Sequence, residues 1–303
     1  MKLNFLSSKN YSEQKDFGDC IVISDISPIL VYDCGSEEHA DRVIDMLLSN
    51  NIDKIDAVLS HNDSDHVSGL LKLKEKGYLG NVYTVCLLRH IDDLMEAIDD
   101  KRYKREKVIE KITEKYSNIA DLQGHLIDIY DDNNNLISNV KDNCDIVAPD
   151  YSYMLETAAR AIKSFEPDTI DGDSVINATS VCLKVKGNKT ILLTGDSTFE
   201  NIENHLNGLD YIQTPHHGRE DQIADLINYY DNDDPIYIIS DNKGDSKGGF
   251  NTDLLKYKAH KCTKDGDIKI DLARVSNQKC LGVELKWDVI LVKNMTSLHI
   301  KII

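Results

Sequence analysis

Residues Ile55 to Gly69, IDAVLSHNDSDHVSG, predict a buried strand, a polar loop and the start of a helix. The run IDAVLS is short and apolar, and apolar residues recur at helical spacing after the loop. The loop between them holds four candidate metal ligands within six residues: His61, Asp63, Asp65 and His66. Small ligands of α/β proteins bind where strands end at their carboxyl edge, so this loop predicts a metal site. The alternative is a polar loop in which Asp65 caps the helix.

Three further predicted strands end in an acidic or imidazole side chain. Asp33 ends PILVYD, Asp196 ends TILLTGD, and His216 and His217 follow LDYIQT. Each end alone is ordinary turn chemistry. Four such ends at one sheet edge predict a shared site of His and Asp ligands, a mixture that suits zinc or manganese.

Composition limits the partners of the chain. Its 303 residues include 35 basic and 52 acidic side chains, a net charge of −17. This balance argues against a broad surface for long nucleic acid, which needs a basic stripe. The negative net charge does not exclude a locally bound anion, because metal ions can make the charge of a single cleft positive.

Cellular location is inferred from cysteine usage and from apolar runs. The seven cysteines form no CxxC pair, which favours reduced thiols over a disulfide framework. The N-terminus has no apolar segment of signal-peptide length, and the apolar runs are too short to span a membrane. We expect a cytoplasmic protein that does not associate with membranes.

Strand and helix signals alternate along the whole chain without an internal repeat or a low-complexity linker. They predict a single α/β domain over residues 1–303, with a charged helical insertion at about 91–150. The insertion is either a solvated surface helix pair or a lid or arm that binds a partner protein or a second copy. Residues 279–292 and 297–303 are expected to form strands.

The loop HNDSDH resembles the metallo-β-lactamase-fold signature HxHxDH, with Asp63 in place of the second histidine. The fuller pattern is similar to the soluble metallo-β-lactamase-like domain of ComEC-type DNA-uptake proteins. The matching segments follow one another in the family order: NFL, FGDCIVI, LVYDCG, HNDSDHVSG, NATSVCL, LLTGDS, TPHHGR and ISDNKG. The resemblance implies a four-layer αβ/βα sandwich with two facing mixed sheets and helices outside.

Site roles follow from the same resemblance. His61 and Asp63 would hold one divalent metal, Asp65 and His66 the second, and Asp196 would bridge the two. Either His217 or His216 completes the second site; we favour His217 as the ligand and His216 as a proton-donating or phosphate-facing residue. Asp33 would orient an imidazole. The residues expected to contact substrate are Asn177, Ser180, Arg219 and Lys243. Arg219 has the alternative of a surface ion pair, and Asn177 that of a substitute metal ligand where the family has its third histidine.

The implied activity is hydrolysis by water activated between two Zn or Mn ions, with Asp65 steering the nucleophile and His216 also catalytic. The favoured substrates are phosphodiesters, such as a small nucleotide or a short nucleic acid, which would make the protein a phosphodiesterase or nuclease. The alternatives are a metallo-hydrolase of a lactone, thioester or amide, and a regulatory module that retains the fold without turnover.

Overall fold

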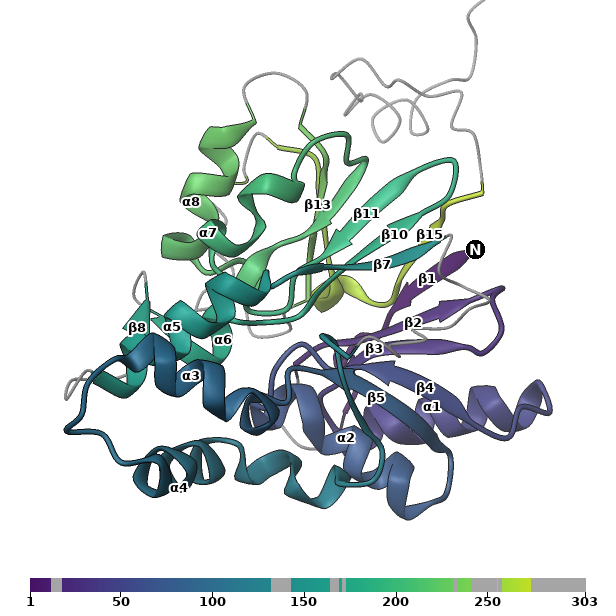
Figure 1. The fold of residues 1–303 in the computed structure, drawn as a ribbon. Helices are drawn as coiled ribbons and strands as arrows, with labels where there is room; N and C mark the ends of the chain where they lie inside the picture. The colour runs from purple at the N-terminus through teal and green to yellow at the C-terminus, as the bar shows by residue number, and fades with distance from the viewer. Residues whose placement is uncertain are drawn as a thin grey trace, which may run out of the picture.

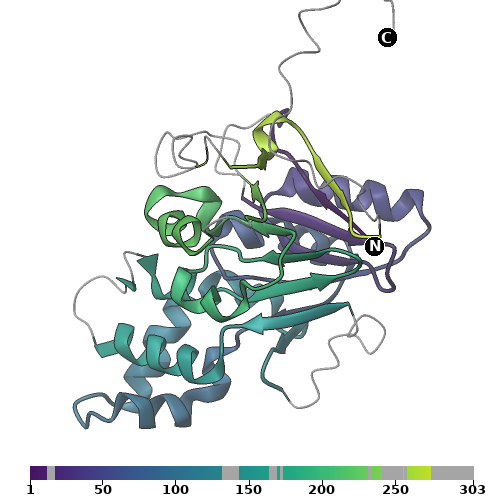
Figure 2. The ribbon, with the colours of Figure 1, turned by 90° about the horizontal axis from the view of Figure 1, so that it is seen from above.

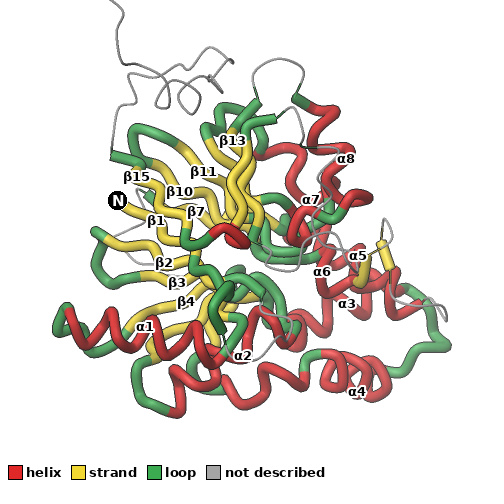
Figure 3. The backbone as a smooth tube through the Cα atoms, turned by 180° about the vertical axis from the view of Figure 1, so that it is seen from behind, coloured by secondary structure: helices red, strands yellow, loops and turns green. Residues whose placement is uncertain are grey.

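The computed structural model describes residues 1–11, 18–131, 143–163, 169–170, 173–230, 234–240, 255 and 258–273. The strands predicted at 279–292 and 297–303 lie outside the described residues, as does Lys243. Two mixed sheets face each other, with helices on their outer faces (Figures 1 and 3).

The first sheet has the strand order β15-β1-β2-β3-β4-β5-β6. The strands β1, β2 and β15 pair antiparallel, whereas β3 to β6 run parallel. The bounds are β1 Lys2–Phe5, β2 Cys20–Ser24, β3 Leu30–Cys34, β4 Ile55–Val58, β5 Leu79–Thr84, β6 Leu126–Asp128 and β15 Ile268–Asp271.

The second sheet has the order β14-β13-β12-β11-β10-β7. The hairpin β10–β11 and the edge strand β7 are antiparallel, and the other neighbours are parallel. The bounds are β7 Cys144–Ala148, β10 Cys182–Lys186, β11 Thr190–Leu193, β12 Tyr211–Gln213, β13 Ile236–Ile239 and β14 His260–Cys262. A separate two-stranded ribbon joins β8 Thr169–Ile170 and β9 Asp173–Ser174.

Helices cover both outer faces and one end of the sandwich (Figures 1 and 2). The helices α1 and α2 lie on the first sheet, α7 and α8 on the second, and α3 to α6 at the end. The bounds are α1 Glu37–Ser49, α2 Ser64–Glu75, α3 Ile91–Ile98, α4 Arg105–Lys115, α5 Tyr151–Lys163, α6 Val175–Ala178, α7 Phe199–Ile202 and α8 Glu220–Tyr229.

Three apolar cores correspond to the three interfaces between the four layers. Strand side chains alternate between two faces, so neighbours in one strand serve different cores. In β2, Ile21 and Ile23 pack between the sheets, whereas Val22 packs under α1 and α2. In β11, Ile191 and Leu193 face the first sheet, and Leu192 packs against α7 and α8. The predicted four-layer αβ/βα sandwich is confirmed.

The segment from 91 to 150 is more than a pair of surface helices. The helices α3 and α4 are followed by β6, which joins the first sheet, and by β7, which joins the second. Both strands take edge positions. The helices occupy only the first part of the range predicted as an insertion, and β6 and β7 in its later part join one sheet each.

The cysteines and the helices bear on the expectations about cellular location. Within the described residues, the six cysteines have free thiols. The helices in this part of the chain are all too short or too polar to cross a membrane.

Candidate metal centre

The predicted ligands come from four loops and helix starts that meet between the sheets. His61 and Asp63 lie in the loop after β4, and Asp65 and His66 lie in the first turn of α2. Asp196 follows β11 in the second sheet. The expectation of one shared sheet edge is therefore wrong, because both sheets contribute ligands. Their facing arrangement brings the two sets of strand ends together.

Imidazole nitrogens converge on the buried Asp196 carboxylate. Oδ1 of Asp196 lies 3.4 Å from Nε2 of His66 and 3.6 Å from Nε2 of His217. Oδ2 of Asp196 lies 3.9 Å from Nε2 of His61. The Asp63 carboxylate approaches His61 Nε2 at 3.6 Å, and the Asp65 carboxylate approaches His217 Nε2 at 3.6 Å. These separations fit donors that surround a cation better than donors that bind one another directly.

The opposite nitrogen of each ring is held by an acceptor. His66 Nδ1 lies 2.9 Å from Asp33 Oδ2, and His61 Nδ1 lies 3.0 Å from the Ser60 hydroxyl, which itself donates to Asp33 at 2.7 Å. His217 Nδ1 lies 2.8 Å from the carbonyl oxygen of Ser240. A ring that donates from Nδ1 keeps its lone pair on Nε2, the tautomer that binds metal.

Several atoms at this centre are buried without a hydrogen-bond partner: His61 Nε2, His66 Nε2 and Asp196 Oδ1. Buried polar atoms are normally paired, so this group requires a ligand. Among the sets of three ligand atoms that lie within 4.8 Å of one another are His61, His66 and Asp196, and Asp65, His66 and His217. The mixture of imidazole and carboxylate donors fits zinc or manganese.

His217 and His216 have different surroundings. His217 belongs to one of the two candidate ligand sets, and its Nδ1 is held by a carbonyl oxygen. His216 Nε2 lies 3.7 Å from Asp196 Oδ2 but also 3.2 Å from the Arg219 guanidinium. A permanent positive charge at that nitrogen disfavours a bound cation there. These surroundings favour His217 as the ligand.

Backbone strain marks the same segment. His216 has φ 48° and His217 has φ 55°, two consecutive non-glycine residues in the left-handed region. Such conformations cost on the order of 1–3 kcal/mol each and collect at functional sites. The strained turn follows Pro215 directly and is held by a hydrogen bond from His216 N to the Gly195 carbonyl oxygen. It presents both imidazoles to Asp196.

Carboxylates dominate the electrostatics of the metal-free centre. Burial opposes a charge on His66 and His217, yet nearby carboxylates, Asp196 foremost, outweigh it and raise both pKa values well above the ordinary range. The pKa of Asp196 is correspondingly held well below its ordinary value by His217, His66 and His216, against the opposing effect of burial. The metal-free centre therefore holds protons where the cations would bind.

Metal affinity is expected to rise with pH for this reason. Below their raised pKa values His66 and His217 are protonated, and each must lose a proton before its Nε2 can bind a cation. Titration calorimetry with Zn²⁺ or Mn²⁺ in buffers of different ionisation enthalpy should show proton release at pH 7. Proton uptake, or affinity that stays constant between pH 6 and pH 8, would contradict this electrostatic description.

Two glycines let the loops pack tightly behind Asp65. A Cβ added to Gly18 would lie 1.8 Å from the Asp65 carbonyl oxygen, and one added to Gly35 would lie 1.9 Å from it. Neither approach leaves room for a side chain, because the obstacle is backbone. These contacts fix the first turn of α2, which carries Asp65 and His66.

Gly35→Ala is expected to lower the free energy of unfolding by about 3 kcal/mol, the upper end for forced overpacking. It should also weaken metal binding, because relieving the clash displaces Asp65. Gly77→Ala is the control, since Gly77 has φ +82° but nothing within 4 Å of an added Cβ; it should cost only about 1–2 kcal/mol. Urea unfolding and metal titration compare them, and equal effects would show that the Asp65 contact is unimportant.

The predicted substrate residues fall into different positions. Asn177 lies beside His216, with Nδ2 3.4 Å from the ring Nδ1, and Arg219 contacts the same ring from the other side. Ser180 is fully buried, and its hydroxyl lies 3.4 Å from His61 Nδ1, a place suited to orienting that ring. Lys243 lies outside the described residues.

Two residues near the centre received no role from the sequence. Asp19, directly before β2, has Oδ1 3.7 Å from His217 Nδ1, and burial raises its pKa to about 6. Its other oxygen accepts from Gln213. Ser60 links Asp33 to His61. The sequence marks these two residues only by their positions, because Asp19 directly precedes a strand and Ser60 directly precedes the ligand His61.

Comparison with known proteins gives a match to one family model and similarity to solved structures, two of which are described here. Residues 15–125 match the family model described as the metallo-beta-lactamase superfamily. The crystal structure of human tRNase Z, short form, is 13% identical, with a TM-score of 0.41 over 90% of this chain and 100% of that chain.

The metallo-beta-lactamase fold protein YhfI from Bacillus subtilis is also 13% identical, with a TM-score of 0.34 over 71% of each chain. The comparison with curated proteins found no match. The two facing mixed sheets with outer helices form the metallo-β-lactamase fold, and residues 15–125 of this chain are similar in sequence to that superfamily.

Proposed function

We propose that the protein is a dinuclear metal-dependent hydrolase that cleaves phosphodiesters. The observation that carries the proposal is the pair of buried, unpaired Nε2 atoms of His61 and His66 beside the unpaired Oδ1 of Asp196, with each ring held at Nδ1 by an acceptor. In this assignment His61 and Asp63 hold one ion, Asp65, His66 and His217 hold the other, and Asp196 lies between them. Two bound dications would activate water and offset the charge that develops on the substrate.

Three side chains near the metal positions have proposed roles in the reaction and in substrate binding. Asp65 reaches the centre from the N-terminus of α2 and is placed to orient the attacking water. His216, with its exposed fraction larger than that of His66, is placed to give a proton to the leaving oxygen. Arg219 lies against His216 and carries the planar charge that binds phosphate in two-point contacts. The likeness to ComEC-type domains also favours phosphodiesters over carboxylic esters.

The test compares substrate classes on the metal-depleted protein after reconstitution with Mn²⁺ or Zn²⁺. Bis(p-nitrophenyl) phosphate should be hydrolysed at least about tenfold faster than a γ-lactone or a nitrophenyl thioester, because two bound dications and the Arg219 guanidinium would complement the charge of phosphate. Faster lactone or thioester hydrolysis would favour the alternative metallo-hydrolase. Two bound metals without turnover of any ester would favour a regulatory module.

A further inference from the structure

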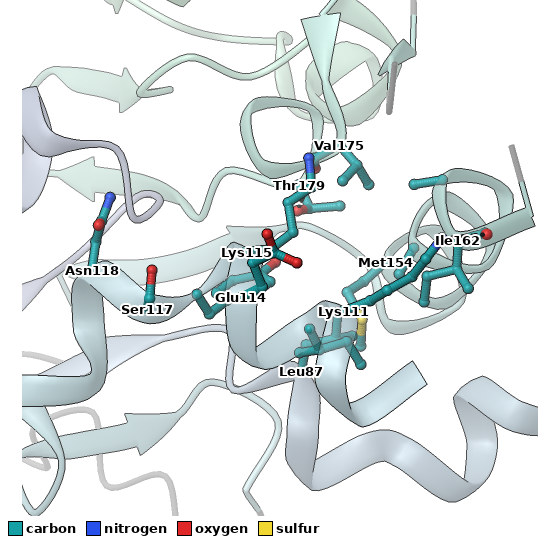
Figure 4. Close-up of a pocket in the computed structure, with 14 residues that line it drawn as sticks. Leu87, Lys111, Glu114, Lys115, Ser117, Asn118, Met154, Ile162, Val175 and Thr179 are labelled. Atoms are coloured by element: carbon teal, nitrogen blue, oxygen red, sulfur yellow. Dashed lines mark hydrogen bonds between the residues drawn. The ribbon is translucent and has the colours of Figure 1, made fainter. Parts of the chain in front are cut away.

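A cavity of about 450 Å³ lies between the insertion helices and α5, beside the metal loops (Figure 4). This volume is within the range of small-molecule sites. In Figure 4 Met154 and Leu87 lie next to each other at one end of the cavity, and Asn118 and Ser117 lie at the other. The apolar side chains that line it include Leu87, Ile112, Met154, Ala158, Ile162 and Val175.

One wall of the cavity is tied to the HNDSDH loop. Asn118, at the end of the cavity, donates from Nδ2 to the carbonyl oxygen of Asn62 at 3.1 Å, and Asn62 donates from Nδ2 to the carbonyl oxygen of Lys115 at 2.7 Å. Asn62 lies between the proposed ligands His61 and Asp63. The wall formed by Lys115 to Asn118 is therefore attached directly to the first metal position.

The opposite wall is tied to the other ligand segments. Val175 and Thr179 line the cavity, and Asn177 between them contacts His216 at 3.4 Å. The next residue, Ser180, contacts His61. Tyr116 joins the two walls: burial raises its pKa to about 12, a hydrogen bond with Thr179 opposes the rise, and the nearby charge of Asp63 adds to it. Both walls thus end at the metal centre.

The charge of the mouth complements an anion. Lys111 and Lys115 line the cavity together with a single acidic residue, Glu114, on a chain whose net charge is −17. Tyr116, Ser117, Asn118 and Thr179 add polar groups to the lining, whereas the part formed by Leu87, Ile112 and α5 is aliphatic. The occupant that fits both features has an apolar group for the interior and an anionic ester for the mouth.

We infer that this cavity is a substrate subsite, and that the substrate is a small phosphodiester with one alkyl or aryl ester group. This inference rests on the proposed function. The apolar group enters the cavity, and its phosphate lies between the lysine-bearing mouth and the metal centre. A long polynucleotide would leave the aliphatic part of the cavity unused.

The first arm of the test measures kcat/KM for p-nitrophenyl alkyl phosphodiesters with methyl, butyl and hexyl groups. Burial of each added methylene should raise kcat/KM about threefold until the cavity is filled. Values independent of chain length would overturn the inference. So would hydrolysis of a single-stranded oligonucleotide that is faster than that of the hexyl ester.

The second arm fills the cavity. Ala158→Phe, on the buried face of α5, should remove the chain-length dependence of kcat/KM while leaving the bound metal in place. Ser152→Phe adds the same ring to an exposed position of α5 and should change neither. An Ala158→Phe variant that keeps the full preference for the hexyl ester would place the alkyl group elsewhere.

The third arm separates the subsite from the chemistry. Calorimetry with hexylphosphonate and methylphosphonate on the metal-depleted protein should show tighter binding of the hexyl compound, and this advantage should disappear in Ala158→Phe. Binding with that pattern but no turnover of any ester would leave the subsite in place and reject the proposed hydrolysis. Turnover without any advantage of the hexyl compound in binding or rate would support the proposed hydrolysis and reject the subsite.

Discussion

Asp196→Asn is expected to abolish nearly all hydrolysis while leaving the protein folded. The Asp196 carboxylate is 4% exposed and lies within 3.9 Å of four imidazole Nε2 atoms, those of His61, His66, His216 and His217. Asparagine keeps the shape but loses the negative charge that offsets two dications. Displaced reacting groups cost on the order of a hundredfold in rate, and loss of a bridging ligand should cost at least that.

The measurements for Asp196→Asn are metal content, turnover of bis(p-nitrophenyl) phosphate and a thermal melt. Asp225→Asn is the matched control, because Asp225 is an exposed residue of α8. Normal turnover with two metals bound to Asp196→Asn would overturn the bridging assignment. An unfolded variant would instead show that the carboxylate is needed for structure.

Joint replacement of His61 and His66 by alanine should remove the metals. Both rings present a buried, unpaired Nε2, and together with Asp196 they form one candidate ligand set. Elemental analysis should fall from about two divalent ions per chain to fewer than one. Because a bound ion stabilises the folded state, EDTA should lower the Tm of the unaltered protein and leave that of the double variant unchanged.

His260→Ala controls for the loss of a histidine, since His260 is exposed at the start of the edge strand β14. It should retain the metals and the response to EDTA. A double variant that still binds two ions would show that the cations are held elsewhere.

Local sequence pattern was sufficient to predict the strand–loop–helix unit that carries His61 to His66. Strand ends that carry Asp or His predicted which loops would meet, because the carboxyl ends of parallel strands lie at the same edge. Pattern could not predict that the ends belong to two sheets, since sheet membership depends on contacts between distant residues. The role of Asp19 was missed for the same reason, because its neighbour His217 is far away in the chain.

The cavity and the strained turn also lay beyond the sequence. The sequence of the insertion predicted charged helices, and in the structure these helices bury Val108 and Ile112. It could not predict that α5 would stand far enough away to leave a space. Likewise, the sequence PHHG does not predict positive φ at His216 and His217, because the surrounding structure imposes that conformation.

The pairing of β1 with β15 has a consequence for how the molecule folds. Lys2 is aligned with Asp271 and Phe5 with Ile268, so β1, the strand next to the edge of the first sheet, gains its second neighbour only from the far end of the described chain. Contacts between such distant residues raise the contact order and slow folding. During synthesis one edge of β1 stays open until residues 268–271 have left the ribosome. The second sheet and its helices can form in that interval, and so the ligands from both sheets can come together before the first sheet is complete.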